Sequence, residues 1–455
     1  MTHRSAPGRR VASAARLTLA PALLLGALAH AQQPDHNGVQ QAVSDETPPP
    51  APAAPAAAAP PPAAPPAQPW DREGFGWGGV PAVAYNSDDG FGYGVLASIY
   101  RYDGGTAPYK WSSTILLYMT TKQVHTHRID LDVIDVGDLP LRLTTRAEFA
   151  STRAANYCGT DPSQPCDLAD AEALAAAMGI EGKAADQLVD RYHKVRLIQP
   201  NGLISARYAI DPMPHKVELM LAWWGQYLIP GDFDVREPYP DTLYAADFPG
   251  GEEGFSSVLQ TGVMVDNRDN EPAPKEGYWV EATVRGGAPV WGSDWSWVGY
   301  NTTLRGYAPF DKRARLIGAA RLVADGVVGD LPFLDETRMG GSQIYESFGG
   351  QRSGRGVRLR GVAGKVRFIA QPELRWTFSS FSVSKAKVDL TAIGFSDVGW
   401  LAEDWQNLDN SALVVTEGVG MRWAVNTNFI IRTDVGFSSR EDFAPGVYID
   451  VGNLW

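Results

Sequence analysis

A strict alternation of polar and apolar residues recurs along the chain from about residue 80 to its end. In residues 216–227, alternate positions read Val, Leu, Leu, Trp, Gly, Tyr on one face and Lys, Glu, Met, Ala, Trp, Gln on the other. Residues 128–133 and 431–437 show the same period of two. Because successive side chains of a β-strand point to opposite faces, this pattern predicts strands with one polar and one apolar face.

Alternating runs of this kind define sixteen candidate strands. They cover residues 80–86, 92–102, 110–121, 126–136, 139–153, 194–208, 216–229, 255–267, 277–287, 295–309, 314–327, 365–378, 386–401, 413–425, 428–439 and 446–454. An even number of strands is what a bacterial barrel requires. After Trp70 no run of about 18 apolar residues occurs, which argues against transmembrane helices.

Alternation alone does not separate a soluble β-sandwich from a membrane barrel, since the apolar faces of a sandwich contact a second sheet. Three further features favour the barrel: aromatic residues lie near strand ends, the chain begins with a secretory signal, and it ends on the aromatic residue Trp455. In a closed barrel the charged faces line a wet interior, and no edge strand is exposed to lipid. The prediction is an all-β fold, a 16-stranded antiparallel transmembrane β-barrel formed by residues 79–455.

Residues 1–31 are interpreted as a secretory signal peptide. Four arginines and no acidic residue flank the start of the apolar run 17–28, and Ala29-His30-Ala31 is a small-x-small cleavage site. Removing these four arginines from 40 basic residues leaves 36 against 52 acidic residues, so the exported chain has a net charge near −16. Such an acidic protein is a poor nucleic-acid binder. We expect it in the bacterial outer membrane, with the lipid of that membrane around it.

Residues 32–78 are predicted to form a periplasmic tether rich in proline and alanine. Between residues 48 and 69, 11 of the chain's 33 prolines occur in 22 positions. A segment of this composition cannot bury a core and is expected to be extended, spanning at most roughly 70 Å at ~3.1 Å per residue. No folded domain is therefore expected before Trp70.

With the amino terminus in the periplasm, connections after odd-numbered strands face the outside of the cell. The longest connections all follow odd-numbered strands: residues 154–193, 230–254 and 328–364. The first contains a helix-like stretch at about 167–190 and both cysteines, Cys158 and Cys166. Exported thiols oxidise, so a short-loop disulfide is predicted. A metal or nucleophile pair is the alternative, although no further cysteine or nearby histidine at ligand spacing supports it.

Four groups of residues resemble the BamA/TamA superfamily of outer-membrane barrels, the bacterial surface antigen family, over roughly residues 79–455. Residues 81–94 look like its first hairpin. The family's turn between strands eight and nine, Asp-x-Arg-Asp followed by proline and glycine, is matched by Asp266, Arg268, Asp269, Pro274 and Gly277. The third group, Leu359-Arg360-Gly361-Val362, lies in the connection after strand eleven, residues 328–364, and is similar to the Val-Arg-Gly-aromatic tip of the family's sixth extracellular loop. The fourth, Phe395-Ser396-Asp397, is similar to the family's Phe-x-Asp on strand thirteen.

The resemblance implies that the sixth extracellular loop folds into the barrel and that Arg360 meets carboxylates there. By alternation, Glu373 lies on the polar face of strand twelve, and Phe395 and Asp397 share a face of strand thirteen. A guanidinium between such carboxylates makes charge-assisted, often bidentate contacts. Arg358 is a substitute for Arg360 by register, and ordinary interior lining by these charges is the alternative. The resemblance also makes Trp455 the end of a C-terminal assembly signal.

Three functions remain open at this point. The first is assembly or translocation of client outer-membrane or secreted proteins, through a weak seam between the first and last strands that the Arg360 loop gates. No counterpart of the family's periplasmic polypeptide-transport-associated domains is expected before the barrel, so client capture would need a separate periplasmic partner. The second is a passive or gated pore that lost the assembly role. The third is a structural or adhesion barrel that displays residues 154–193.

Catalytic and cofactor-binding motifs are not evident in the sequence. It has no Gly-x-Ser-x-Gly elbow and no phosphate-binding Gly-Lys-Ser/Thr motif, although a hydrolase that combines residues from separate strands would show no such spacing. His125 and His127 share one strand face, as an exposed pair or as a two-histidine metal site without an evident third ligand. We expect a non-enzymatic barrel without cofactor or metal.

Overall fold

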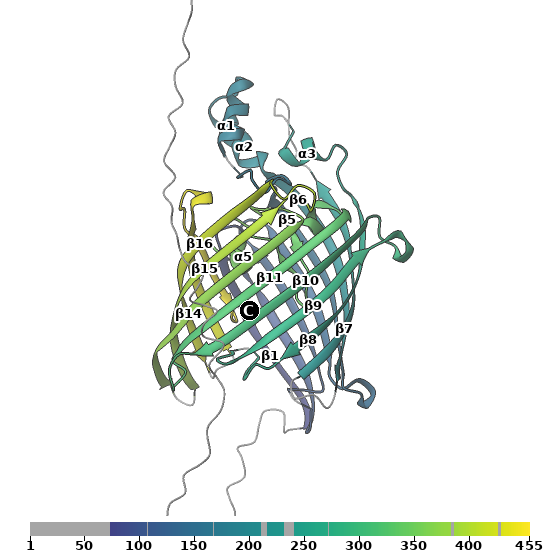
Figure 1. The fold of residues 1–455 in the computed structure, drawn as a ribbon, viewed down its shortest axis with the longest axis vertical. Helices are drawn as coiled ribbons and strands as arrows, with labels where there is room; N and C mark the ends of the chain where they lie inside the picture. Colours follow the sequence, from purple (N-terminus) through teal and green to yellow (C-terminus); the bar gives the residue numbers. More distant parts are fainter. Residues whose placement is uncertain are drawn as a thin grey trace, which may run out of the picture. The chain divides into compact units, whose positions relative to one another are not determined.

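The computed structural model describes residues 73–455, apart from 107, 167, 211–215, 232–240, 272, 384–385 and 426–428. Its long strands close into one antiparallel barrel, in which consecutive strands are paired and the first is paired with the last (Figure 1). The predicted all-β, 16-stranded barrel is confirmed. The predicted signal peptide and most of the predicted tether lie outside the described residues.

The strands of the barrel follow the predicted runs closely. They are β1 (Glu73–Asn86), β2 (Gly90–Asp103), β3 (Trp111–Thr120), β4 (Val124–Val133), β5 (Leu141–Asn156), β6 (Lys194–Ile210), β7 (Lys216–Gly231), β8 (Gly254–Asp266), β9 (Gly277–Gly287), β10 (Ser296–Pro309), β11 (Leu316–Asp330), β14 (Val366–Val383), β15 (Ala386–Ala402), β16 (Ser411–Val425), β17 (Phe429–Ser438) and β18 (Gly446–Val451). Two very short strands, β12 (Arg338–Met339) and β13 (Tyr345–Glu346), pair within the connection between β11 and β14.

The two ends of the barrel sequence differ from the prediction. Residues 73–78, assigned to the tether, belong to β1. Glycine occupies four of the seven positions 73–79 and hides the alternation there. Phe75 and Trp77 are nevertheless exposed on the same face as the other outward residues of the strand. At the other end, β18 stops at Val451, before the predicted 454, because Gly452 adopts φ 94° and turns the chain out of the sheet.

Helices occur only in connections within the described part of the chain. They are α1 (Leu168–Ala177), α2 (Lys183–Tyr192), α3 (Leu243–Asp247), α4 (Phe333–Glu336) and α5 (Gly350–Ser353), with short 3-10 turns at Val136–Asp138, Pro289–Trp291 and Ser439–Glu441. The predicted helix at 167–190 is thus two helices, α1 and α2. In the described residues, no helix has both the length and the apolar character needed to cross a membrane.

The helices α1, α2 and α3 lie at one end of the barrel, here called the helical end (Figure 1). Because the strands are antiparallel and consecutive, the β1–β2, β3–β4, β5–β6, β11–β14 and β17–β18 connections all lie at this end. The opposite end, here called the short-turn end, carries the β8–β9 turn and the residues after β18. This distribution of long and short connections is the one that the sequence predicts.

The inner and outer faces of the strands differ in the way that the alternation predicts. On β4, Ile129 is 54% exposed on the outer surface, whereas Asp130 points inward and accepts a hydrogen bond from Arg146 of β5 at 2.7 Å. Four of the largest fully buried side chains are arginines: Arg321, Arg355, Arg367 and Arg432. An apolar outer surface around a charged interior is the inverse of a soluble domain and is typical of a barrel that spans a bilayer.

The seam where the barrel closes is paired over a short length. β1 pairs with β2 along its whole length, from Glu73↔Asp103 to Asn86↔Gly90. With β18, by contrast, its register pairs among the described residues are Tyr85↔Ile449 and Asn86↔Tyr448, and the N–H of Ser87 donates to the carbonyl of Val447 at 3.2 Å. The seam is therefore closed at the helical end, and the rest of β1 has a free edge as far as the described residues go.

Candidate functional site

The connection between β11 and β14, residues 331–365, packs against the interior face of the barrel. Phe348 is fully buried in an apolar cluster that also contains Val357 and Val362 of the connection and Leu401 of β15. The N–H of Ser342 donates to Glu281 of β9 at 3.0 Å. Because the partners of this segment come from many strands of a closed barrel, the segment lies across the interior.

Further polar contacts of the connection reach the opposite wall. Arg338 donates to Gln199 of β6 at 2.9 Å and to Gln226 of β7 at 2.6 Å. Gln226 and Ser256 of β8 donate in turn to Asp335 at 2.7 and 2.6 Å. These contacts hold the first half of the connection against the wall that faces away from the seam.

The centre of the site is Arg355, which follows the short helix α5 and is fully buried. Its Nε and Nη2 donate to Oδ2 and Oδ1 of Asp397 on β15 at 2.9 and 2.8 Å. Its Nη1 donates to Glu373 of β14 at 2.8 Å. The guanidinium carbon lies 3.4 Å from the ring centroid of Phe395. The guanidinium is thus held on its edges by two carboxylates and on one face by an aromatic ring.

The charges around Arg355 form a larger network that extends towards the seam. Asp434 of β17 lies 3.7 Å from Arg355 and also from Arg432, and it accepts from Arg422 of β16 at 2.7 Å. Arg432 donates to Asp450 of β18 at 3.0 Å. Burial by itself lowers the pKa of Arg355, but the carboxylates of Asp397, Glu373 and Asp434 raise it above its ordinary value, so the arginine is cationic.

Arg360 is not the arginine of this cluster, which corrects the prediction from the sequence. It pairs with Glu346 of the same connection at 2.9 Å. Arg358, the substitute by register, pairs with Glu441 in the β17–β18 connection at 2.6 Å. The predicted acceptors Glu373 and Asp397 and the ring of Phe395 do meet a loop arginine, but that arginine is Arg355.

Backbone geometry explains the difference. Residues 350–353 form the short helix α5, and an antiparallel bridge joins Gly350 to Gly354. The chain therefore turns back on itself immediately before Arg355. Gly356 has φ 104°, and a Cβ at this position would lie 2.6 Å from the backbone of Gly436 and Phe437 on β17. Gly361 instead closes a turn in which its N–H donates to the carbonyl of Arg358 at 2.9 Å. The glycines on both sides of Arg355 were the signal in the sequence for this close approach.

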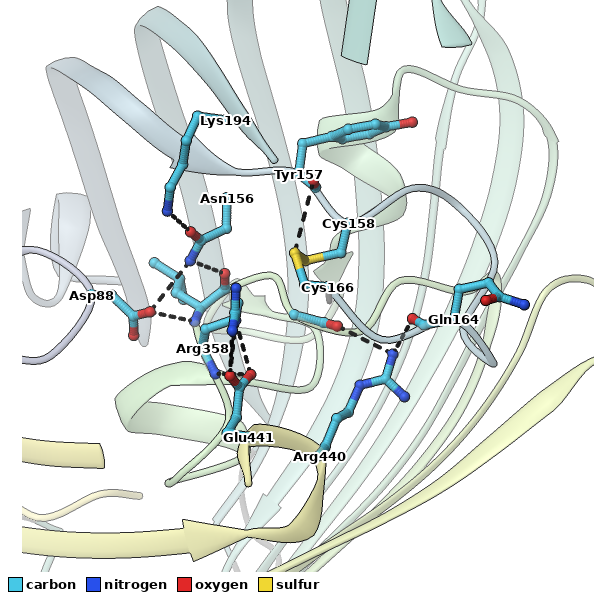
Figure 2. The surroundings of a disulfide bond; sticks show 12 residues. Asp88, Asn156, Tyr157, Cys158, Gln164, Cys166, Lys194, Arg358, Arg440 and Glu441 are labelled. Carbon is cyan, nitrogen blue, oxygen red and sulfur yellow. Dashed lines mark hydrogen bonds and ion pairs between the residues drawn. A yellow bond between two sulfur atoms is a disulfide. The ribbon is translucent and has the colours of Figure 1, made fainter. Parts of the chain in front are cut away.

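The residues after Arg355 contact both sides of the seam at the helical end. The N–H of Gly356 donates to the hydroxyl of Tyr448 on β18 at 3.0 Å. Three residues later, the N–H of Leu359 donates to Asp88 in the β1–β2 connection at 2.9 Å. Figure 2 shows Asp88 beside Asn156 of β5, which donates to Asp88 at 3.3 Å and to the carbonyl of Leu359 at 2.9 Å. Burial, opposed by the Leu359 hydrogen bond, raises the pKa of Asp88 to about 6.

The disulfide loop also contacts the seam region. Cys158 and Cys166 are bonded to each other in the structure, as predicted (Figure 2). Arg440, beside Glu441 in the β17–β18 connection, donates to the carbonyl of Gln164 inside this loop and to that of Gly361. The loop that follows β5 is therefore attached to the turn that precedes β18.

The predicted turn motif forms a compact unit at the short-turn end. Arg268 donates from Nε and Nη2 to the two carboxylate oxygens of Asp266, both at 2.9 Å. Asp269 accepts from the N–H groups of Lys275 and Glu276 at 2.9 and 3.2 Å. Gly277 has φ 101°, and a Cβ there would lie 2.0 Å from the carbonyl oxygen of Asn267. Pro274, between these residues, is buried.

Trp455, the residue of the predicted C-terminal assembly signal, lies inside the barrel. Beyond Gly452 the chain crosses to the wall formed by β10 and β11, where Leu454 and Trp455 pack with Tyr307 and Ala319. The hydroxyl of Tyr307 donates to a main-chain oxygen of Trp455 at 3.2 Å. Trp455 is 6% exposed, and the guanidinium of Arg375 lies 5.0 Å from its ring.

A model of the Omp85 superfamily domain matches residues 232–454. No curated protein matches the chain. Among solved structures, BamA from Haemophilus ducreyi lacking POTRA domains 1-3 is 13% identical with a TM-score of 0.50, over 84% of this chain and 70% of that chain. CdiB from Escherichia coli is 11% identical with a TM-score of 0.54, over 82% of this chain and 62% of that chain. This chain thus spans less than two thirds of CdiB, and at these identities the likeness is one of fold.

Proposed function

Since a model of the Omp85 superfamily domain matches residues 232–454, we propose that the chain is an outer-membrane barrel that assembles or translocates polypeptides through the seam between β1 and β18. The observation that carries the proposal is the short pairing of this seam, at Tyr85↔Ile449 and Asn86↔Tyr448. The helical end is assigned to the outside of the cell and the short-turn end to the periplasm. The protein acts without catalytic chemistry.

The free edge of β1 is the feature that a client strand would use. In the described part of the chain, no strand pairs with residues 73–84 on the seam side. Their N–H and C=O groups are a template on which an extended segment can add as a further strand. Trp77 and Phe75 on this stretch are 86% and 69% exposed. An incoming strand would satisfy the backbone groups and place its own apolar side chains beside these rings.

The β11–β14 connection supports a role as a latch on the seam. It is fixed to β14 and β15 through Arg355 and reaches Tyr448 on one side of the seam and Asp88 on the other. Holding both sides from within stabilises the short paired stretch against separation. Release of these contacts would allow the seam to open along its whole length. Client capture is assigned to a separate periplasmic partner.

A folding assay in liposomes tests the proposal. The purified barrel is reconstituted, and the folding rate of a urea-denatured test barrel is measured by heat-modifiable gel mobility, together with the ion conductance of the same liposomes. We expect acceleration by the wild-type chain and loss of acceleration when Tyr85→Cys and Ile449→Cys, which are direct register partners, are oxidised to lock the seam. Leu304→Cys with Leu322→Cys, partners on β10 and β11, is the matched control that leaves the seam free.

The outcomes separate the three candidate functions. Acceleration that the seam lock abolishes and the β10–β11 lock leaves intact supports assembly through the seam. Steady conductance without acceleration would instead show a pore. Absence of both signals would leave a structural or adhesion barrel, and equal acceleration by locked and unlocked chains would overturn the role of the seam.

A further inference from the structure

The pair His125 and His127 has no role in the seam or in the arginine cluster. Both residues belong to β4 and lie on the same face as Ile129 and Leu131, which are 54% and 37% exposed on the outer surface. The two imidazole centroids are 5.9 Å apart. Among the described residues, no group of three metal-binding side chains includes this pair. The histidines therefore belong to the outer wall of the barrel, near its helical end.

Neighbouring strands continue the row of each histidine around the outer wall. His127 pairs with Leu117 of β3 and Phe149 of β5, and its ring stacks on that of Phe149 at 6.4 Å and 7°. One step nearer the helical end, His125 pairs with Met119, which in turn pairs with Tyr93 of β2. The histidines thus continue a row of aromatic and apolar side chains at the level where an aromatic girdle is expected.

Two cations lie at the rim beyond this row. Lys122, in the β3–β4 turn, donates from Nζ to the carbonyl of Ser87 at 2.8 Å. Arg153 of β5 donates from Nη1 to Oε1 of Gln123 at 2.9 Å. Both acceptors are neutral groups, so neither contact neutralises the charge of its cation. The outward positions of β3, β4 and β5, which are the odd-numbered ones, carry no acidic residue in this part of the described chain.

The order of these side chains along the strands matches the order of chemical groups along a membrane lipid. Apolar side chains such as Ile115 and Ile129 come first, the histidines and Phe149 follow, and Arg153 and Lys122 come last, at the helical end. Acyl chains contact the first group, and the polar interface of the bilayer is where aromatic rings collect. Lysine and arginine beyond that level are the residues that bind phosphate in lipid headgroups.

We propose that the outer wall of β3–β5 at the helical end is a binding site for a membrane lipid with an anionic, phosphate-bearing headgroup. Lys122 and Arg153 supply the positive charge, and the imidazoles of His125 and His127 supply hydrogen-bonding groups just below it. The inference depends on the barrel lying in a bilayer and not on any transport through the seam. The ligand class is a lipid, because the site adjoins the exposed apolar wall that Ile115, Leu117 and Ile129 form on the outside of the barrel.

Native mass spectrometry of the barrel in a neutral detergent tests this site, with short-chain phosphatidic acid as the probe and phosphatidylcholine of the same chain length as the zwitterionic comparison. We expect retention of phosphatidic acid over phosphatidylcholine, and binding weaker by about tenfold in the variant His125→Leu/His127→Leu/Arg153→Gln. Arg101→Gln is the matched control, since Arg101 is an outward cation of β2 near the other end of the barrel, packed over Phe75 at 5.0 Å.

Heat-modifiable gel mobility shows which variants fold, and His127→Gln, which keeps a polar side chain, serves if the triple variant does not. Equal retention of the two lipids by the wild-type chain would overturn the site. An equal loss of binding in the Arg101→Gln control would overturn it as well, by showing that any outward cation suffices. Displacement of the lipid by an equal concentration of inorganic phosphate would reject a lipid in favour of a free anion.

Discussion

Arg355 and Asp397 are joined by three hydrogen bonds: the backbone N–H and Nε of Arg355 donate to Oδ2 at 2.9 and 2.9 Å, and Nη2 donates to Oδ1 at 2.8 Å. Both side chains are fully buried. One carboxylate therefore fixes the backbone of the connection and the orientation of its guanidinium at the same time. Loss of Arg355 would leave the buried carboxylate of Asp397 without this cation.

Replacement of Arg355 is expected to be the most damaging single change in the connection. Arg355→Ala should lower the free energy of unfolding by about 3–5 kcal/mol, because it removes the guanidinium that donates to the buried carboxylate of Asp397 and leaves Glu373 paired with Arg375 alone at hydrogen-bond distance. Arg360→Ala, at the partly buried pair with Glu346, should cost no more than about 1–2 kcal/mol. Urea unfolding in lipid vesicles measures both, and proteolysis of residues 331–365 reports release of the connection. A larger loss for Arg360→Ala would contradict the assignment.

Asp88, in the turn between β1 and β2, makes the seam contact dependent on pH. Its pKa is raised from 3.8 to about 6 in the folded barrel, so the folded chain binds this proton more tightly than the unfolded chain. The resulting stabilisation is complete below about pH 4 and is lost as the pH rises through 6. Asp88→Asn keeps an acceptor for the N–H of Leu359. At pH 8 its free energy of unfolding should exceed that of the wild type by about 1–2 kcal/mol, a smaller difference than a fully buried carboxylate would produce.

Near pH 4 the two proteins should have the same stability, since Asp88 is then protonated. Urea unfolding at the two pH values measures the difference, with the exposed Asp409→Asn in the β15–β16 connection as control. A gain for Asp88→Asn that is equal at both pH values would show that the effect does not come from ionisation.

The β8–β9 turn needs glycine at position 277 for two reasons that a matched variant separates. Gly277 and Gly292 both have positive φ, 101° and 88°, but a Cβ at 277 would lie 2.0 Å from the carbonyl oxygen of Asn267, whereas a Cβ at 292 meets open space. We expect Gly292→Ala to cost about 1–2 kcal/mol, from backbone strain alone. Gly277→Ala should cost more, about 3 kcal/mol or above, since the turn must also move. Similar unfolding midpoints for the two variants would contradict the steric argument.

The segment after β18 should contribute to stability through packing. Trp455→Ala removes a buried ring from the side of Tyr307 and should cost about 2–4 kcal/mol. Tyr307→Phe removes one hydrogen bond to the main chain of Trp455 and should cost about 1 kcal/mol. In the double variant the two losses should not add, because the hydrogen bond has no defined partner position once the ring is gone. Additive losses in urea unfolding would indicate that Trp455 and Tyr307 act independently.

The fold was largely predictable because alternation is a local property with a direct physical cause. Each barrel strand has one face in an apolar environment and one in a charged interior, so the sequence carries the pattern within every strand. The exception, residues 73–78, is a stretch where glycine replaces the inward side chains and removes the signal. Strand order followed as well, since consecutive antiparallel strands need no long-range information.

The position of the buried arginine was not predictable in the same way. Three arginines, Arg355, Arg358 and Arg360, lie within six residues, and they pair with different acids. Arg355 pairs with acids on β14 and β15, Arg358 with Glu441 in the β17–β18 connection, and Arg360 with Glu346 in the β11–β14 connection. Spacing along the chain does not decide among them, because the choice depends on the turn at α5 and on the approach of Gly356 to β17. The acids were predictable because alternation fixes the face on which Glu373 and Asp397 lie. The end of the last strand was predicted at 454 instead of 451 for a related reason: Gly452 ends the strand, and nothing in the alternation shows it.

The unequal lengths of the strands have a consequence for the surrounding bilayer. β14 has 18 residues, whereas β18 has 6, and a tilted strand needs about 9–11 residues to cross the hydrocarbon core. Beside β18 the protein wall is therefore shorter than the lipid that it faces, and the mismatch has to be taken up by acyl chains that shorten or disorder locally. We therefore expect the bilayer to be thinnest beside β18, at the seam where the barrel is least closed.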